Sequence, residues 1–364
     1  MENQNIPYET LAAGQNKGTS RKTLVAGWFS FEGCNVTAGD VMARDLACEW
    51  LEQACCQYDV ALVAPFIGGV DWRSVDPTSY SRVVFVCGPF PLIKLTSEFL
   101  EYFSGCRLIG LDLSMIEPLN NWNPFDVLIE RDSSVGSHPD ITFLSRQAKV
   151  PVVGIILVHP QDEYGDKGKH QVANEAINRL IASREMVAVP IDTGLEPNTT
   201  NLRNAAEVES LIARMDVVVT TRLHGTVLAL KNGVPVVAID AIAGGAKVVR
   251  QVETIGWPIV FPIDNLSDEL LEKAFDYCLT EDARAKTREC RDGAIKGVEQ
   301  VRNQFISTLD SSNQSSARVW SEEALNKSKS FSKVWPNLRK QAIAIRYEIT
   351  GGIRKWLFKQ LFRP

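Results

Sequence analysis

One stretch of the sequence decides the fold: DVVVTTRLHGTVLALKNGVPVVAID at residues 216–240. Its pattern predicts a strand that ends at Thr220-Thr221, a helix over about residues 223–232 and a second strand that ends at Asp240. Gly233 is a natural helix stop, and Pro235 just beyond it cannot continue a helix. Two strands that are apolar throughout and joined by a helix indicate a parallel βαβ unit covered on both faces.

The same alternation of short apolar runs and helical patterns continues through most of the chain. Ten strand candidates suit two parallel sheets better than one, with a boundary near Lys149-Val150-Pro151. We therefore expect an α/β protein with two Rossmann-like parallel-sheet domains that face each other across a cleft. We expect a flexible N-terminus at residues 1–22, an N-terminal domain at 23–150 and a C-terminal domain at 151–310. A serine-rich linker at 311–334 and a basic helical tail at 335–364 are expected to follow.

Composition and charge exclude several classes of protein. The 364 residues carry a net charge of -5, which does not indicate a nucleic-acid partner. Eight cysteines without a CxxC pair favour buried, reduced thiols, and four histidines without ligand spacing predict no metal site. The N-terminus lacks the apolar core of a signal peptide, and no apolar run approaches the roughly 18 residues that span a bilayer. We therefore expect a cytoplasmic protein.

Arg222 and His224 are the residues that carry chemistry in the deciding stretch. They lie in the turn between the end of a parallel strand and the start of the following helix, which is where open α/β sheets bind their ligands. The N–H groups of a helix N-terminus favour anions, arginine adds a fork that fits phosphate or carboxylate, and histidine can move a proton near neutral pH. These properties predict an anion site with acid/base capacity. The alternative is that Arg222 pairs with a nearby acid and His224 caps the helix.

Several motifs together resemble the polysaccharide pyruvyl transferase family. The C-terminal block carries the most specific match, through Thr221-Arg222-Leu223-His224-Gly225, Ala229-Leu230, Gly233-Val234-Pro235 and Lys247. The N-terminal half is similar at Gly27, Asn35 and Gly39-Asp40, at the strand-like run 83–88, and at Arg131-Asp132-Ser133. The resemblance spans roughly residues 23 to 280.

The resemblance implies a fold like that of the GT-B glycosyltransferases and a ketal-forming reaction. Pyruvate is moved from phosphoenolpyruvate onto two hydroxyls of a sugar in a cell-surface polysaccharide or its precursor, and phosphate is released. Phosphoenolpyruvate serves as co-substrate, so no cofactor is expected. No metal is needed either, because cationic side chains can supply the charge stabilisation.

The resemblance also assigns roles to individual residues. His224 would donate the proton to the methylene carbon or contact the phosphate, and Arg222 would clamp the phosphate or carboxylate. Lys247 would add a positive charge, and Arg131 would reach across the cleft from the first domain. Asn35, Gly39 and Asp40 would face the acceptor sugar, with Asp40 as catalytic base or, alternatively, as the N-cap of the following helix.

Two further groups are candidate acceptor contacts. Trp28, Phe29 and Phe31 offer aromatic surface on which a sugar could stack, with core packing as the alternative. Asp162, Glu163, Tyr164 and Asp166 follow a predicted strand, with a solvated loop as the alternative.

The C-terminal tail differs in charge from the rest of the chain. From Lys327 onward it carries ten Lys or Arg and one acidic residue, Glu348, so its net charge is +9 against -14 for the remainder. Apolar residues recur at helical spacing through Trp335, Leu338, Ala342, Ile345 and Ile349. This pattern predicts a cationic amphipathic helix that contacts the inner membrane surface, where a lipid-linked acceptor would lie, or that docks on the protein itself.

Two other functions compete with pyruvyl transfer. A GT-B glycosyltransferase would use a nucleotide sugar and would need an acidic residue for the ribose hydroxyls, of which the sequence has no recognisable example. A non-catalytic sugar- or anion-binding module would need only part of the set formed by Arg222, His224 and Lys247.

Overall fold

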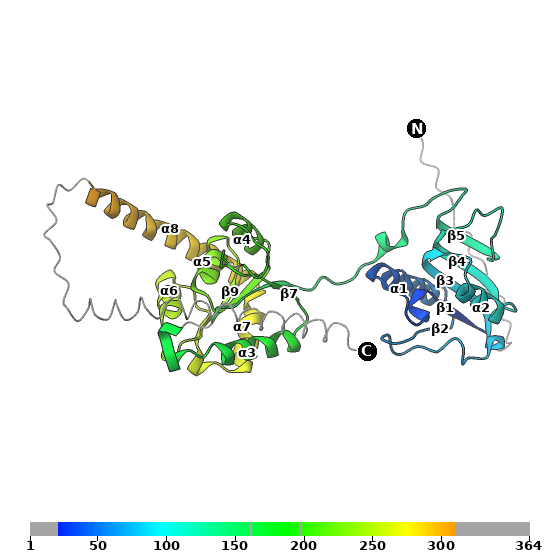
Figure 1. Cartoon of the computed structure of the whole chain (residues 1–364), viewed down its shortest axis with the longest axis horizontal. Helices are drawn as coiled ribbons and strands as arrows, with labels where there is room; N and C mark the ends of the chain where they lie inside the picture. Colours follow the sequence, from blue (N-terminus) through cyan, green and yellow to red (C-terminus); the bar gives the residue numbers. More distant parts are fainter. Residues whose placement is uncertain (1–20, 160–161, 197, 310–364) are drawn as a thin grey trace, which may run out of the picture. The chain divides into compact units, whose positions relative to one another are not determined.

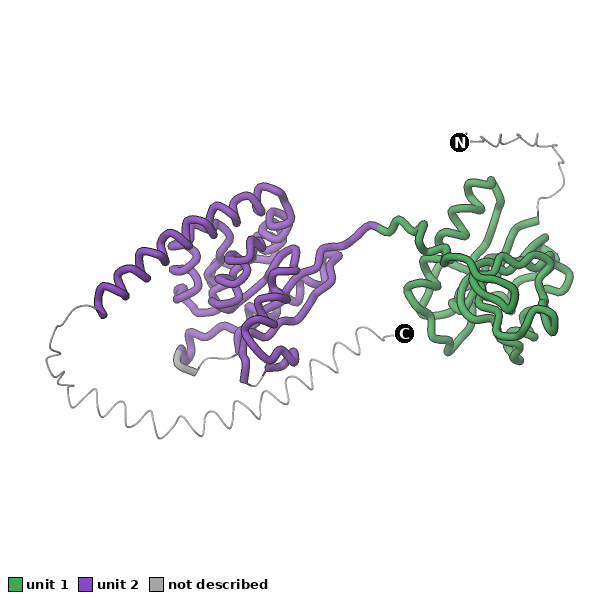
Figure 2. Tube along the Cα trace, turned by 90° about the horizontal axis from the view of Figure 1, so that it is seen from above, with its two compact units in different colours: residues 1–147, 362–364 green, residues 148–361 purple. Residues whose placement is uncertain are grey.

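The computed structural model describes residues 21–159, 162–196 and 198–309. Contacts divide the chain into two compact units, and the chain passes from the first to the second between Gln147 and Ala148. Figure 2 colours the two units, which are described separately below. The predicted N-terminal segment up to residue 20, the linker and the basic tail lie outside the described residues.

The first unit is built on a parallel five-stranded sheet of order β2-β1-β3-β4-β5. Its elements are β1 (Lys22–Ala26), α1 (Ala38–Gln53), β2 (Tyr58–Val60), β3 (Tyr80–Phe90), α2 (Lys94–Tyr102), β4 (Arg107–Met115) and β5 (Val127–Asp132). Side chains alternate across β1: Leu24 and Ala26 join one core with Phe99 of α2, and Val25 joins another with Ala43 of α1. The two helices therefore bury opposite faces of this sheet.

The second unit repeats the architecture with a sheet of order β10-β9-β8-β6-β7, again all parallel. Its strands are β6 (Val152–Ile156), β7 (Val187–Pro190), β8 (Val217–Thr220), β9 (Val236–Asp240) and β10 (Val260–Pro262). Its helices are α3 (His170–Ser183), α4 (Ala205–Ile212), α5 (Leu223–Lys231), α6 (Lys247–Ile255), α7 (Asp268–Cys278) and α8 (Glu281–Leu309). Helix α3 packs beside α7, and α5 contacts α4, α6 and α8 (Figure 1).

Both sheets have the same topology, which fixes where a site can form. In each, the second strand lies on one side of the first, and the third strand returns to its other side. The chain therefore reverses direction across the sheet between β1 and β3 in the first unit and between β6 and β8 in the second. In sheets of this order, ligands bind outside the carboxyl ends of the strands at such a switch point.

The expected α/β fold with two parallel sheets is confirmed. The long helix α8, of 29 residues, ends the described part of the chain. Among the described residues, no helix is long and apolar enough to cross a membrane.

Candidate functional site

The turn from β8 into α5 is held by threonine hydroxyls. Thr220 Oγ1 donates to the Ile156 carbonyl at 2.8 Å and accepts from the Arg222 N–H at 2.9 Å. Thr221 Oγ1 accepts from the Val158 N–H at 2.8 Å. These bonds tie the ends of β6 and β8 together at the switch point and fix the backbone of Arg222 as the N-cap of α5.

Gly225 lets α5 approach the sheet closely. A Cβ atom at this position would lie 2.4 Å from Thr220 Oγ1 and 3.0 Å from Ile156 Cγ2, so any larger residue would force the helix and the sheet apart. At the other end of the helix, Asn232 is the C-cap and Gly233 has a φ of 72°, the left-handed conformation typical of a helix stop. The predicted strand-helix-strand reading of this stretch is confirmed.

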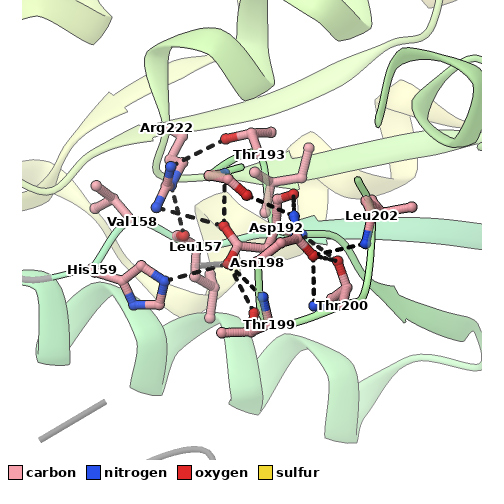
Figure 3. A network of polar contacts seen from close by, with 12 residues as sticks. Leu157, Val158, His159, Asp192, Thr193, Asn198, Thr199, Thr200, Leu202 and Arg222 are labelled. Atoms are coloured by element: carbon pink, nitrogen blue, oxygen red, sulfur yellow. Dashed lines mark hydrogen bonds and ion pairs between the residues drawn. The ribbon is translucent and has the colours of Figure 1, made fainter. Parts of the chain in front are cut away.

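The side chain of Arg222 is directed at the ends of two neighbouring strands (Figure 3). Its Nε donates to the Leu157 carbonyl at 3.0 Å, beyond β6, and its Nη1 donates to Thr193 Oγ1 at 3.2 Å, beyond β7. Its Nη2 lies 3.7 Å from Asp192 Oδ1, so the alternative that Arg222 pairs with an acid is realised. These contacts hold the guanidinium in one orientation at the switch point.

Asp192 is a functional candidate that the sequence analysis missed. It is buried, and its carboxylate accepts from the N–H groups of Gly194 and Thr199 and from Thr199 Oγ1, at 2.8 to 3.0 Å. Its Oδ2 also lies 3.8 Å from His159 Nε2 (Figure 3). Burial opposes its ionisation, but the nearby His159 imidazole and the hydrogen bonds from Gly194 and Thr199 outweigh burial and hold the pKa of Asp192 below its usual range.

A signal for Asp192 was present in the sequence. The polar pair Asp192-Thr193 comes one residue after the end of β7, at the same sheet edge as Arg222. His159 likewise follows β6 by three residues. Neither position stands out without the strand order, because the loop after β7 could have lain at a distant part of the sheet.

His224 lies in the first turn of α5, and its side chain is exposed. No side chain at the N-cap accepts a hydrogen bond from the first turn of this helix. Within the described ranges, no hydrogen bond to the imidazole is present. The turn therefore presents N–H groups, a helix dipole and an imidazole at one place, which suits an anion that must also receive a proton.

Lys247 begins α6, which follows the neighbouring strand β9. Its exposed side chain places Nζ 5.8 Å from the centre of the Tyr164 ring, so Tyr164 comes to the same sheet edge from the 3-10 segment Asp162–Lys167. The backbone of this helix end is already used: buried Asp240 Oδ2 accepts from the N–H groups of Ala246, Val248 and Val249. Lys247 thus offers side-chain charge, while Asp240 occupies the helix N-terminus.

The predicted acceptor-side residues lie around the start of α1 in the first unit. Thr37 is the N-cap, and Asp40 is the third helical residue, so the expectation that Asp40 itself could be the N-cap is wrong. Asp40 Oδ2 accepts from Thr37 N–H at 2.8 Å and from Thr37 Oγ1 at 2.7 Å, which completes a capping box. Gly39 lies in the same helical turn, and Asn35 is exposed in the loop before it.

Two of the three aromatic residues after β1 pack in the hydrophobic core of the first unit. Phe29 and Phe31 are almost fully buried, so core packing, the alternative stated for them, holds. Trp28 is half-buried, and its Nε1 donates to the Pro89 carbonyl at 3.0 Å. A Cβ at Gly88 would lie 2.6 Å from this indole ring, so the ring needs a glycine beside it at the end of β3.

Arg131 is held within the first unit. Its guanidinium donates to Asp140 at 2.9 Å and to Ser114 Oγ at 2.7 Å, and it lies 3.9 Å from the buried Asp112.

Cys87 and Asp112, on adjacent strands, both have positive φ values, 62° and 57°, which L-residues rarely adopt. Burial, together with the charges of Asp40 and Asp112, raises the pKa of Cys87 to about 12.

The predicted residues therefore form two groups. Arg222, His224 and Lys247 share the carboxyl edge of the second sheet, at the starts of the helices α5 and α6 that follow the adjacent strands β8 and β9. Asn35, Gly39, Asp40 and Arg131 belong to the first unit, at the carboxyl ends of β1 and β5 or in the segment that follows β1. Their assigned roles toward substrates stay predictions.

Comparison with solved structures gives distant likenesses only. Spinosyn forosaminyltransferase SpnP is 12% identical over 75% of this chain and 94% of its own, with a TM-score of 0.28. The glycotransferase of kitacinnamycin is 10% identical over 78% and 98%, with a TM-score of 0.27. MurG of Acinetobacter baumannii is 10% identical over 74% and 95%, with a TM-score of 0.25. These TM-scores are too low to support a fold assignment, which rests on the two parallel sheets of this chain.

Sequence comparison is more specific. The search of curated protein sequences gave no match. The family model described as polysaccharide pyruvyl transferase matches residues 139–241, a segment that includes Arg222, His224 and Asp192 but ends before Lys247. The resemblance inferred from the motifs is thereby confirmed over the strands and loops that build the second-unit site, and the chain is identified as a transferase enzyme similar to the polysaccharide pyruvyl transferases.

Proposed function

We propose that this protein transfers pyruvate from phosphoenolpyruvate onto two hydroxyls of a sugar and releases phosphate. The observation that carries the proposal is the placement of Arg222 and His224 at the start of α5, beside the β6/β8 switch point. The family match over residues 139–241 supports the same chemistry. The acceptor belongs to a cell-surface polysaccharide or its precursor in this proposal.

The donor fits the cations and dipoles of this sheet edge. Phosphoenolpyruvate carries a phosphate and a carboxylate, so it needs several positive groups at one place. The start of α5 contributes main-chain N–H groups and a helix dipole, worth about 0.3–1 kcal/mol per favourable charge at an exposed helix end. Arg222 contributes a guanidinium that is already oriented by Leu157 and Thr193, so little of its side-chain entropy remains to be lost on binding.

The reaction needs a proton donor as well as a cation. The methylene carbon of phosphoenolpyruvate must gain a proton while the adjacent carbon is attacked by a sugar hydroxyl. His224 is exposed at the same helix start, and an imidazole can carry a proton near neutral pH. We assign it the donor role, and we assign Lys247, beyond the neighbouring strand, to one of the two anionic groups.

The first unit supplies the acceptor side in this proposal. Asn35, Gly39 and Asp40 lie around the start of α1, and Asp40 is the carboxylate of that group. Arg131 is assigned to the donor through the family resemblance, and its ion pairs with Asp140 and Asp112 would then have to be shared with the substrate. The basic tail is assigned to an inner membrane surface that carries a lipid-linked acceptor.

A thermal-shift experiment tests the donor assignment. Phosphoenolpyruvate should raise the melting temperature, with about 2.7 kcal/mol of stabilisation at one hundred times its Kd, whereas nucleoside diphosphates should not. Arg222→Ala should abolish the shift. The matched control is Arg179→Ala, because Arg179 is ion-paired with Asp268 on the surface of the same unit. A shift with nucleoside diphosphates alone would favour the nucleotide-sugar glycosyltransferase instead.

Turnover is tested by phosphate release from phosphoenolpyruvate. The enzyme is incubated with a panel of lipid-linked and nucleotide-linked sugars, and the ketal product is identified by mass spectrometry. Binding of phosphoenolpyruvate without release of phosphate in any mixture would instead indicate a binding module.

A further inference from the structure

A second imidazole lies at the carboxyl edge of the same sheet as His224. His159 follows β6, and Val158 before it donates to Thr221, three residues before His224. The strands β6 and β8 are direct neighbours, with Ile156 paired to Thr220 at their ends. The two histidines therefore come from adjacent strand ends that are hydrogen-bonded to each other.

His159 faces a carboxylate that stays ionised. Its Nε2 lies 3.8 Å from Asp192 Oδ2, and Figure 3 shows the ring turned toward this carboxylate. Asp192 Oδ1 lies 3.7 Å from Arg222 Nη2, so the two oxygens of one buried carboxylate approach an imidazole and a guanidinium. Hydrogen bonds from Gly194 and Thr199 fix that carboxylate in place. Asp192 thus ties the position of His159 to that of Arg222.

The exposure of His159 suits contact with a substrate. Its side chain is 42% exposed, whereas Asp192 behind it is 4% exposed. An imidazole that faces solvent on one side and a buried carboxylate on the other has the arrangement of a general base oriented by a third group. The separation of 3.8 Å is longer than a hydrogen bond, as is common for catalytic pairs before substrate binds.

We propose that His159 is the catalytic base that accepts the proton of the attacking sugar hydroxyl, and that Asp192 is its positioning residue. This inference rests on the proposed function. In the addition step, the hydroxyl oxygen bonds to C2 of phosphoenolpyruvate, the hydroxyl proton passes to His159, and the C2–C3 π electrons take a proton from His224. C3 becomes the methyl group.

The second step restores both histidines. The bond from C2 to the phosphate oxygen breaks, and phosphate leaves with the electron pair and takes the proton from His159. The second hydroxyl oxygen bonds to C2, and its proton returns to His224. Two hydroxyl protons are consumed in total, one by the methyl group and one by phosphate, so the atoms balance. Asp40 is the alternative base, but its Oδ2 is already bonded twice to Thr37.

The test is chemical rescue of His159→Ala in the full-length protein. Phosphate release from phosphoenolpyruvate is measured with a panel of 4-nitrophenyl hexopyranosides and with water alone as acceptor. We expect kcat to fall by about 10²–10⁴-fold, the usual contribution of a general base, with little change in KM for phosphoenolpyruvate. Added imidazole should restore part of kcat, which it could not do for a residue with a purely structural role. His138→Ala, which removes an exposed imidazole of the first unit, should behave as the wild type.

A second variant tests the positioning role. Asp192→Asn keeps the size of the side chain but removes its charge, and should lower kcat with only partial rescue by imidazole, because Arg222 is displaced as well. Asp216→Asn is its control, since Asp216 accepts from Val152 N–H at the opposite edge of the sheet. Activity of His159→Ala equal to wild type, or a deficit that imidazole leaves unchanged, would overturn the inference alone. An inactive wild type would overturn the proposed function together with it.

Discussion

Replacing Gly225 by alanine tests whether close packing of α5 positions the site. The new Cβ would lie 2.4 Å from Thr220 Oγ1, whereas ordinary contact begins at about 3.4 Å, so the helix start and the strand must separate by about 1 Å. Thr220 Oγ1 cannot simply rotate away, because it bonds both the Ile156 carbonyl and the Arg222 N–H. The first turn of α5, which carries Arg222 and His224, is therefore the part that moves.

The expected magnitudes follow from this displacement. Overpacking a buried contact costs about 1–3 kcal/mol, and alanine regains about 1 kcal/mol of helix propensity, so we expect a net loss of up to about 2 kcal/mol in the free energy of unfolding. A displacement of about 1 Å at catalytic groups costs about 10²-fold in rate. Gly225→Ala should therefore lose far more activity than stability.

The assay compares unfolding by urea with kcat/KM for phosphate release. Gly293→Ala is the matched control, because Gly293 lies in α8 with no atom within 4 Å of the added Cβ. That variant should be stabilised by about 1 kcal/mol and keep full activity. A Gly225→Ala enzyme with wild-type kcat/KM would refute the argument that the helix contact sets the position of Arg222 and His224.

Three further predictions concern charge and the tail. His224→Ala should lower kcat by about 10²–10⁴-fold and leave the melting temperature nearly unchanged, because the side chain is exposed; wild-type turnover would refute its donor role. The pKa of Asp192 is depressed by folding, so its stabilisation is present above its unfolded pKa of about 3.9 and is lost as pH falls through the folded pKa. The difference in melting temperature between wild type and Asp192→Asn should therefore stay constant from pH 7 to about pH 5 and shrink as the pH falls below about 4, and a difference that stays constant down to about pH 3 would contradict this. Deletion of residues 330–364 should abolish sedimentation with anionic liposomes; unchanged sedimentation would exclude the tail as an anchor.

The local pattern was enough to locate α5 and its flanking strands. The apolar run before Thr220, the helical spacing after Arg222 and the stop at Gly233 each act over a few residues, so they can be read without knowledge of the fold. The same holds for the motif that contains Arg222 and His224. The alternation of apolar strands and helices also predicts that these residues lie at the carboxyl edge of a parallel sheet.

The partners of those residues could not be read in this way. Asp192 lies 30 residues before Arg222 in the sequence. It reaches the guanidinium only because β7 and β8 are the two direct neighbours of β6, which brings the ends of all three strands together. For Asp40, local sequence did indicate a helix start, but the side chain of Thr37 decided which residue became the N-cap. Capping depends on the backbone angles of a single residue, which the pattern of apolar residues does not fix.

The sequence by itself determined two parallel sheets, the turn that carries Arg222 and His224, and the glycine that stops the helix, because apolar periodicity and turn chemistry are local. Tertiary structure alone decided that one buried carboxylate joins Arg222 to His159, that Asp240 rather than a ligand occupies the start of α6, and that Arg131 is held by Asp140. Each of these depends on the order of strands in a sheet, and that order is set by long-range packing of whole faces against each other.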